Sequence, residues 1–223
     1  MSDQDALTPR VFLVRHGETE WAKSGRFTGI TDIELTQTGI TQVSLMAETF
    51  VGAGKLLDAS HLSHIFVSPR SRAVKTFQIL LPPPANPVAE KTVYTEDIAE
   101  WNYGDYEGLT DQEIRDLRKK EGLDYERDWS IWMDGCKGGE SAQAVSERLD
   151  RLISNIKEIQ RPYMRGEKPA NVLLVAHRLI LRCFVKRWLG WTIHSELPMT
   201  LLPGSISVLR CDLSHSVSNM LYY

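Results

Sequence analysis

Cysteine and long apolar runs are both scarce in this sequence of 223 residues. The three cysteines (Cys136, Cys183 and Cys211) are widely spaced and form no CxxC pair, which argues against a disulfide framework and a cysteine zinc site. No apolar stretch approaches the roughly 18 residues of a membrane span. Residues 1–10 are polar and lack the apolar core of a signal peptide. The sequence therefore predicts a reduced, soluble, cytoplasmic protein with no membrane partner.

A surplus of charge of either sign is also missing. The chain has 26 lysines and arginines against 29 aspartates and glutamates, which gives a formal net charge of −3. This balance provides no general attraction to nucleic acid or to an anionic membrane. If the protein binds an anionic small molecule, the positive charge for it must be concentrated locally, so clustered arginines are the most informative feature.

The remaining composition is that of an ordinary globular protein, with 42% hydrophobic and 25% charged residues. Predicted strands alternate with predicted helices along the chain, which is typical of α/β proteins with a mainly parallel sheet. We expect one domain over residues 1–223, a three-layer α/β/α sandwich. Residues 98–138, rich in aromatic and charged side chains, are expected to form an excursion that caps the sheet. The sequence leaves open whether the chain forms an oligomer.

Hydrophobic periodicity and capping residues place the individual elements. Strands are expected at residues 11–14, 64–67, 92–94, 171–176, 205–211 and 217–222. Helices are expected at residues 35–51, 71–81, 111–121, 141–160 and 179–189. Thr36 is expected to cap the first of these helices.

Polar side chains follow three of the predicted strands directly. Arg15, His16 and Gly17 follow the first strand, residues 68–72 (SPRSR) follow the second, and His177 follows residues 171–176. In parallel sheets, ligands bind beyond the carboxyl ends of the strands, so these groups are expected to converge. Arginine forks and a helix N-terminus suit phosphate oxygens, and Gly17 allows the backbone to approach a ligand closely. The pattern predicts an oxyanion site.

The two histidines, His16 and His177, could instead bind a metal. The surrounding arginines and the lack of metal-ligand spacing argue against a metal site.

A carboxylic acid near this site could give a proton to a leaving oxygen. Residues 100–108 (EWNYGDYEG) supply carboxylates among aromatic side chains, whose apolar walls raise a carboxyl pKa. Spacing alone does not choose among Glu100, Asp105 and Glu107.

Four segments together resemble the histidine phosphatase superfamily, in its phosphoglycerate-mutase-like group. They are residues 15–21 (RHGETEW), 27–29 (FTG), 68–76 (SPRSRAVKT) and 139–141 (GES), in the family's order along nearly the whole chain. The resemblance implies a phosphatase that forms a phosphohistidine on His16 and needs no metal or cofactor. It assigns the catalytic arginines to Arg15 and Arg72, the general acid to Glu100 and the second histidine to His177.

Other residues are candidates for binding a small phosphorylated substrate. Thr28 offers a hydroxyl, Gly29 belongs to the family motif and Tyr103 could pack on a sugar chain. Arg70, Arg178 and Arg182 add cations beyond one phosphate clamp, which predicts a preference for a bisphosphorylated sugar over a monophosphate.

Two positions depart from the family pattern. Arg178 stands where the family usually has glycine after the second histidine, so it could add a phosphate contact or crowd the pocket. Ala22 stands where many mutases carry asparagine.

Two alternative functions remain. A mutase would return the phosphoryl group to substrate, but phosphoglycerate mutases usually have Asn-Lys in the stretch where this chain has Leu109, Thr110 and Asp111. A non-catalytic phosphate-binding protein would explain Arg178 but not the presence of all the catalytic residue types.

Overall fold

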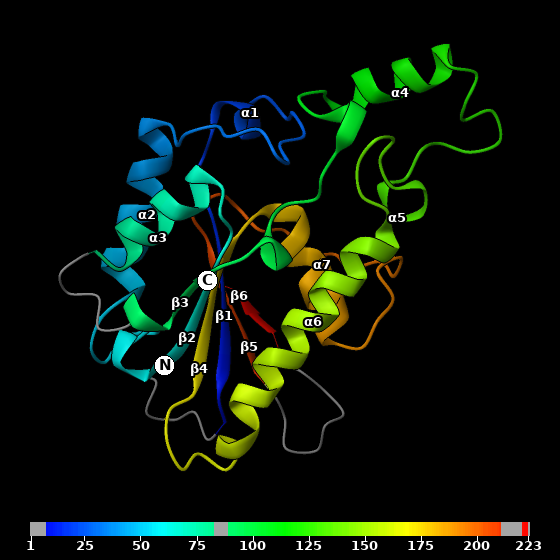
Figure 1. Ribbon diagram of the computed structural model, residues 1–223. Coiled ribbons are helices and arrows are strands. Elements are labelled where there is room, and N and C mark those ends of the chain that lie inside the picture. The colour runs from blue at the N-terminus through cyan, green and yellow to red at the C-terminus, as the bar shows by residue number, and fades with distance from the viewer. Residues whose placement is uncertain (1–7, 83–88, 211–219, 223) are drawn as a thin grey trace.

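The computed structural model describes residues 8–82, 89–210 and 220–222. Its centre is a six-stranded sheet in the order β3-β2-β4-β1-β5-β6 (Figure 1). The strands are β1 (Arg10–Arg15), β2 (Leu62–Val67), β3 (Thr92–Tyr94), β4 (Asn171–Ala176), β5 (Ile206–Arg210) and β6 (Met220–Tyr222). The first four pair in parallel, and β5 and β6 are antiparallel. The prediction of an α/β fold with a mainly parallel sheet is confirmed.

Helices cover both faces of this sheet. Helices α2 (Gln37–Phe50) and α3 (Ser71–Leu80) lie on one face, and α6 (Ala142–Gln160) and α7 (Arg178–Trp188) lie on the other (Figure 1). Successive side chains of a strand point to opposite faces. Accordingly Val11 and Leu13 of β1 join the core that holds α6 and α7, whereas Phe12 and Val14 join the core that holds α2 and α3. Three layers result.

The five predicted helices are present, with ends that differ by one or two residues from those expected. Thr36 caps α2 as predicted, because its hydroxyl oxygen accepts a hydrogen bond from Gly39 N at 2.9 Å. The predicted polar helix is α4 (Asp111–Lys120), which begins with a reciprocal capping box between Thr110 and Glu113. Capping chemistry therefore fixes the helix starts where hydrophobic periodicity is weak.

The strand predictions agree with the structure where it describes them. Residues 92–94 and 171–176 match their strands, and the other predicted strands differ by one or two residues at their described ends. Cys211 and residues 217–219 lie outside the described part of the chain.

Short elements that periodicity does not reveal complete the fold. They are α1 (Glu20–Lys23), α5 (Ile131–Asp134), and the 3-10 turns η2 (Ala59–His61), η3 (Ala89–Lys91), η4 (Glu96–Ile98), η5 (Gly104–Tyr106) and η6 (Arg161–Tyr163). Residues 98–138 carry α4 and α5, which stand beyond the carboxyl ends of the strands (Figure 1). Tyr106 and Trp129 of this segment belong to the core cluster that contains α6 and α7. Within the described residues, no helix is both long enough and apolar enough to cross a membrane.

Candidate active site

The two histidines that follow neighbouring strands lie side by side. Strands β1 and β4 are adjacent, with Arg15 opposite Ala176, so the next residue on each strand is a histidine. The backbone N–H of His16 donates to the carbonyl of Ala176 at 2.9 Å. The His16 and His177 ring centroids are 5.0 Å apart. The predicted convergence of these strand ends follows directly from the parallel register.

The His16 ring is held in one tautomer. Its Nδ1 lies 2.7 Å from the carbonyl oxygen of Gly17. Because a carbonyl only accepts, Nδ1 carries the proton and Nε2 keeps its lone pair. Burial, with the nearby charges of Arg72 and Arg15, holds the His16 pKa well below its usual range. His16 is therefore neutral near pH 7, as a nucleophile must be.

Gly17 has a packing role that the sequence did not indicate. A Cβ on Gly17 would lie 2.4 Å from the carbonyl oxygen of Gly39, near the start of α2. Its N–H donates to the Thr76 hydroxyl of α3 at 3.2 Å. The missing side chain thus allows the loop after β1 to press against α2, which helps to fix the His16 backbone.

His177 has a protein partner on each ring nitrogen. Arg72 Nε donates to Nδ1 at 3.1 Å, so the His177 proton lies on Nε2, which is 2.7 Å from the Ser68 hydroxyl oxygen. Burial and the charge of Arg72 lower the pKa of His177 well below its usual range. The ring is neutral, and its orientation is set from both sides.

Arg72 is fully buried next to His177. Its Nη atoms donate to the carbonyls of Thr28, Gly29 and Thr31 at 2.9 to 3.0 Å. The N–H groups of Gly29 and Thr31 are in turn bound by the carboxylate of Glu107. The loop over residues 28–31 is therefore clamped between Arg72 and Glu107.

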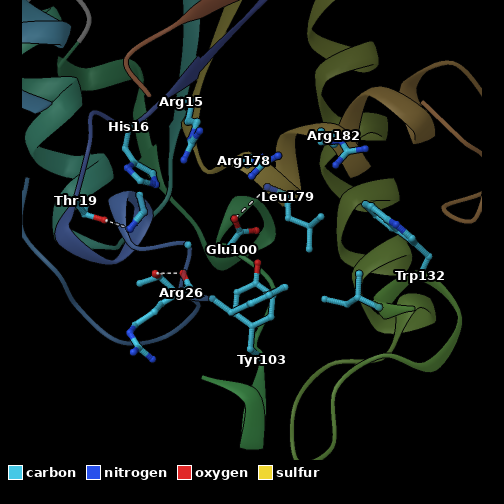
Figure 2. A pocket seen from close by; sticks show the side chains of 15 residues that line it. Arg15, His16, Thr19, Arg26, Glu100, Tyr103, Trp132, Arg178, Leu179 and Arg182 are labelled. Atoms are coloured by element: carbon cyan, nitrogen blue, oxygen red, sulfur yellow. Dashed lines mark hydrogen bonds between the residues drawn. The ribbon is translucent and has the colours of Figure 1, made fainter. Parts of the chain in front are cut away.

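A pocket of about 310 Å³ opens in front of His16 (Figure 2). Most of its lining comes from the segment after β1, from Glu100 and Tyr103, from α5 and from the start of α7. The lining residues are Arg15, His16, Thr19, Ala22, Gly25, Arg26, Phe27, Thr28, Glu100, Tyr103, Ile131, Trp132, Arg178, Leu179 and Arg182. Arg72 and His177 are not among them, although the His177 ring lies next to that of His16.

Glu100 caps helix α7 from outside that helix. Its carboxylate accepts hydrogen bonds from the backbone N–H groups of Trp101, Leu179 and Ile180 at 2.9 to 3.1 Å. Burial raises the pKa of this carboxyl above its usual value, while the three N–H donors and Arg72 work against that rise. Among the three carboxylates that spacing left open, only Glu100 lines the pocket within the described chain.

Four arginines line this pocket, and one of them, Arg178, repels both Arg15 and Arg182. Arg15 donates to the carbonyl of Leu201 at 2.6 Å, and burial together with the charge of Arg178 lowers its pKa to about 10. Arg182 donates to the carbonyl of Leu197 at 3.2 Å, and burial and Arg178 lower its pKa as well. The Arg178 side chain is exposed, and among the described residues it forms no hydrogen bond or ion pair. An anion between these cations would relieve their repulsion.

The other predicted substrate residues are placed differently. Thr28 and Tyr103 line the pocket, and Tyr103 packs edge-on against Phe27 with ring centroids 4.9 Å apart. Gly29 does not line the pocket, and its carbonyl accepts a hydrogen bond from Arg72. Arg70 is outside the lining, because its guanidinium forms two hydrogen bonds with the Glu96 carboxylate, at 2.9 and 3.2 Å.

Several lining residues were not predicted as site residues from the sequence. They are Arg26, Ile131, Trp132 and Leu179. Ile131 and Trp132 belong to the four-residue helix α5, which is too short for a periodic pattern. Their only signal is the clustering of aromatic residues in the segment over residues 98–138. In the described ranges, no group of three or more His, Cys, Asp or Glu side chains is arranged to hold a metal ion.

Comparison with known proteins agrees with this geometry. The model of the histidine phosphatase superfamily (branch 1) matches residues 11–221. Sedoheptulose 1,7-bisphosphatase of Saccharomyces cerevisiae is 41% identical over 193 residues, which are 86% of this chain and 71% of the yeast protein. An acid phosphatase of Mycobacterium tuberculosis is 34% identical over 95% of this chain and 90% of its own. A phosphoglycerate mutase of Schizosaccharomyces pombe is 35% identical over 93% of this chain and 92% of its own.

Proposed function

Because this chain belongs to the histidine phosphatase superfamily and is a phosphoric monoester hydrolase, we propose that it hydrolyses a sugar phosphate through a phosphohistidine on His16. The observation that carries the proposal is the state of His16. Its Nδ1 proton is bound by the Gly17 carbonyl, and the ring lines a pocket that also contains Arg15 and Glu100. This leaves Nε2 as an unprotonated nucleophile at neutral pH.

In the first step, the Nε2 lone pair of His16 attacks phosphorus and the bond from phosphorus to the ester oxygen breaks. Glu100 enters this step protonated and gives its proton to the leaving alkoxide, so the sugar departs as an alcohol. The raised pKa of Glu100 supports this role, because it increases the protonated fraction of the carboxyl.

In the second step, water attacks the phosphorus of phosphohistidine and the bond from phosphorus to nitrogen breaks. Glu100, now a carboxylate, takes the proton of the attacking water and returns to its starting form. Inorganic phosphate leaves, and His16 is neutral again.

The positive groups around His16 stabilise the charge on the phosphoryl oxygens. Arg15 lines the pocket and is placed for direct contact. Arg72 and His177 do not line the pocket and act from beside His16. The contacts of Arg72 with three carbonyls and His177 leave at least one N–H of Nη1 without a partner among them.

We further propose that the substrate is a bisphosphorylated sugar, either sedoheptulose 1,7-bisphosphate or a related compound. Arg178 and Arg182 line the pocket in addition to Arg15, which exceeds the needs of one phosphate. The name of the yeast relative points to the same substrate class. The segment over residues 98–138 is proposed to act as a cap, because Tyr103, Ile131 and Trp132 form part of the pocket wall. A cytoplasmic location stays a prediction.

A mutase is the second candidate, since the fission yeast relative carries that name. The residues that differ from the usual mutase pattern, Thr110 and Asp111, belong to the capped start of α4 in this chain. They stabilise the cap segment rather than line the pocket. Hydrolysis is the better supported outcome, because the yeast and mycobacterial relatives carry phosphatase names.

The test is a panel of sugar monophosphates and bisphosphates, assayed for inorganic phosphate and for isomerised product. We expect phosphate release, and a gain of one phosphoryl group on the His16 peptide in rapidly quenched samples analysed by mass spectrometry. His16→Ala should lose both signals. Isomerisation without phosphate release would establish the mutase, and binding without either product would establish a phosphate-binding protein. Full turnover by His16→Ala would contradict the phosphohistidine route.

A further inference from the structure

Lys186 is a buried cation that the proposed reaction does not use. It lies on α7, and its side chain is only 2% exposed. Its ammonium donates to the carbonyl of Ile193 at 2.8 Å. No carboxylate in the described chain forms an ion pair with it, and burial lowers its pKa to about 8. A buried ammonium without a counter-ion is costly, and an apolar side chain of similar length would avoid that cost. Stability alone therefore gives no reason for a lysine here.

The second partner of this ammonium is an aromatic ring of the pocket wall. Lys186 Nζ lies 3.4 Å from the centre of the Trp132 ring, which is within the range of a cation–π interaction. The guanidinium of Arg182, one turn earlier on α7, lies 5.5 Å from the same ring. Two cations of α7 thus hold one tryptophan of α5.

Trp132 occupies the side of the pocket away from His16. Figure 2 shows it next to Arg182, with Glu100 and Tyr103 between it and the histidine. It is half-buried, and its ring packs edge-on against Trp101 with centroids 6.3 Å apart. Helix α5 has only four residues, and its N-cap Ser130 makes no side-chain capping bond. A helix of this length has little stability of its own, so the ring depends on tertiary contacts for its position.

We propose that Lys186 is a positioning residue that fixes Trp132 as the far wall of the pocket, and so sets the affinity for the part of the substrate farthest from His16. This inference rests on the proposed function, because it assigns a wall to the same site. The chemistry at phosphorus is far from this wall and is unaffected by it. Lys186 therefore influences the binding of a long substrate, and a short phosphate ester that ends before Trp132 is insensitive to it.

The direct test compares Lys186→Met with the parent enzyme on two substrates, fructose 1,6-bisphosphate and the shorter glycerol 3-phosphate. For the bisphosphate, KM should rise about tenfold, the size of effect that a desolvated cation–π contact produces, while kcat stays within about twofold. Neither parameter should change for glycerol 3-phosphate. The melting temperature should stay within about 4 °C of the parent value, which corresponds to a stability change of about 1 kcal/mol or less.

A double-mutant cycle with Trp132 separates positioning from general stability. Trp132→Leu should raise KM for the bisphosphate to a similar extent, and Lys186→Met should add nothing in that background. Lys186→Arg, which keeps the cation, should recover most of the parent KM. Lys157→Met is the matched control, since Lys157 lies 5.5 Å from the Trp188 ring and does not line the pocket. It should leave both substrates unchanged.

Several outcomes would overturn the proposal. They are an unchanged bisphosphate KM in Lys186→Met, an equal loss of activity on both substrates, and effects that multiply in the double mutant. If Lys186→Met does not fold, Trp132→Leu provides the test. A parental bisphosphate KM in that variant would show that Trp132 takes no part in substrate binding and would overturn the proposal. If the parent releases no phosphate from any ester, the proposed function fails. Calorimetric binding of fructose 1,6-bisphosphate to the parent and to Lys186→Met then tests the wall separately.

Discussion

At Glu100, burial and hydrogen bonding act on the carboxyl pKa in opposite directions, and burial is the larger effect. The three N–H donors and Arg72 act against the rise that burial causes, because they favour the charged form of the carboxyl. The same contacts tie Glu100 to the first turn of α7, immediately after His177. The side chain that we propose as the proton donor thus also fixes the start of the helix that carries Arg178 and Arg182.

These protonation states predict the pH dependence of kcat/KM. Activity should fall as pH rises through the pKa of Glu100, because the deprotonated carboxyl cannot protonate the leaving oxygen. It should fall on the acid side only below pH 6.5, the ordinary histidine pKa, because the pKa of His16 is lowered well below that value. In Glu100→Gln, kcat should drop by about 10² to 10⁴ and the alkaline limb should disappear.

The measurement is kcat/KM across the pH range for the parent and for Glu100→Gln, with the exposed Glu158→Gln as a charge-matched control. The control should reproduce the parent profile. An alkaline limb that persists unchanged in Glu100→Gln would assign the proton donor to another residue.

At the scale of elements, α6 carries the anchor for the segment that presents Glu100. Arg148, with a side chain 9% exposed, forms two hydrogen bonds with the Glu140 carboxylate, at 2.8 and 3.0 Å. Its Nη1 also donates to the carbonyls of Glu96, Asp97 and Ala99 at 2.8 to 3.2 Å. This one side chain therefore ties α6 to the segment that runs from η4 to the general acid.

We expect Arg148→Met to lower the free energy of unfolding by roughly 3 kcal/mol, because it leaves a largely buried carboxylate and several carbonyls without their partner. It should also lower kcat, since Glu100 loses its support. Arg151→Met is the control on the same helix, as it removes only the exposed ion pair with Asp97 and should cost less than about 1 kcal/mol. Urea denaturation of both variants measures the difference, and equal destabilisation would contradict the anchor.

The elements also show what sequence could and could not predict. The strand-end histidines were predictable because parallel strands bring successive carboxyl ends to one edge, and that rule needs only local pattern. Arg70 was placed with the phosphate because it alternates with Arg72, yet it pairs with Glu96, 26 residues away. The contact of Lys186 with Trp132 joins residues 54 positions apart through a helix too short to show periodicity. Contacts of this kind depend on tertiary packing, which no local pattern encodes.

At the scale of the whole molecule, charge is unevenly distributed. The chain has a net charge of −3, but the pocket lining includes four arginines against one glutamate. The net negative charge therefore repels an anionic substrate weakly at long range. The arginines of the pocket, including the exposed Arg178, attract it strongly at short range. Such local attraction is sensitive to ionic strength, because the screening length is about 10 Å at 0.1 M salt.

Salt should therefore raise KM for a sugar bisphosphate more steeply than KM for the matching monophosphate. Arg178→Gln should raise the bisphosphate KM about tenfold at low salt and flatten its salt dependence, because it removes the exposed cation that has no partner in the described chain. Arg161→Gln changes the net charge equally on the exposed end of α6, away from the pocket lining. It should keep the parental slope. If both variants shift KM and its salt slope alike, the attraction belongs to the whole molecule and Arg178 has no specific role. If only Arg178→Gln does, the substitution of arginine for the usual family glycine is what adapts this pocket to a second phosphate.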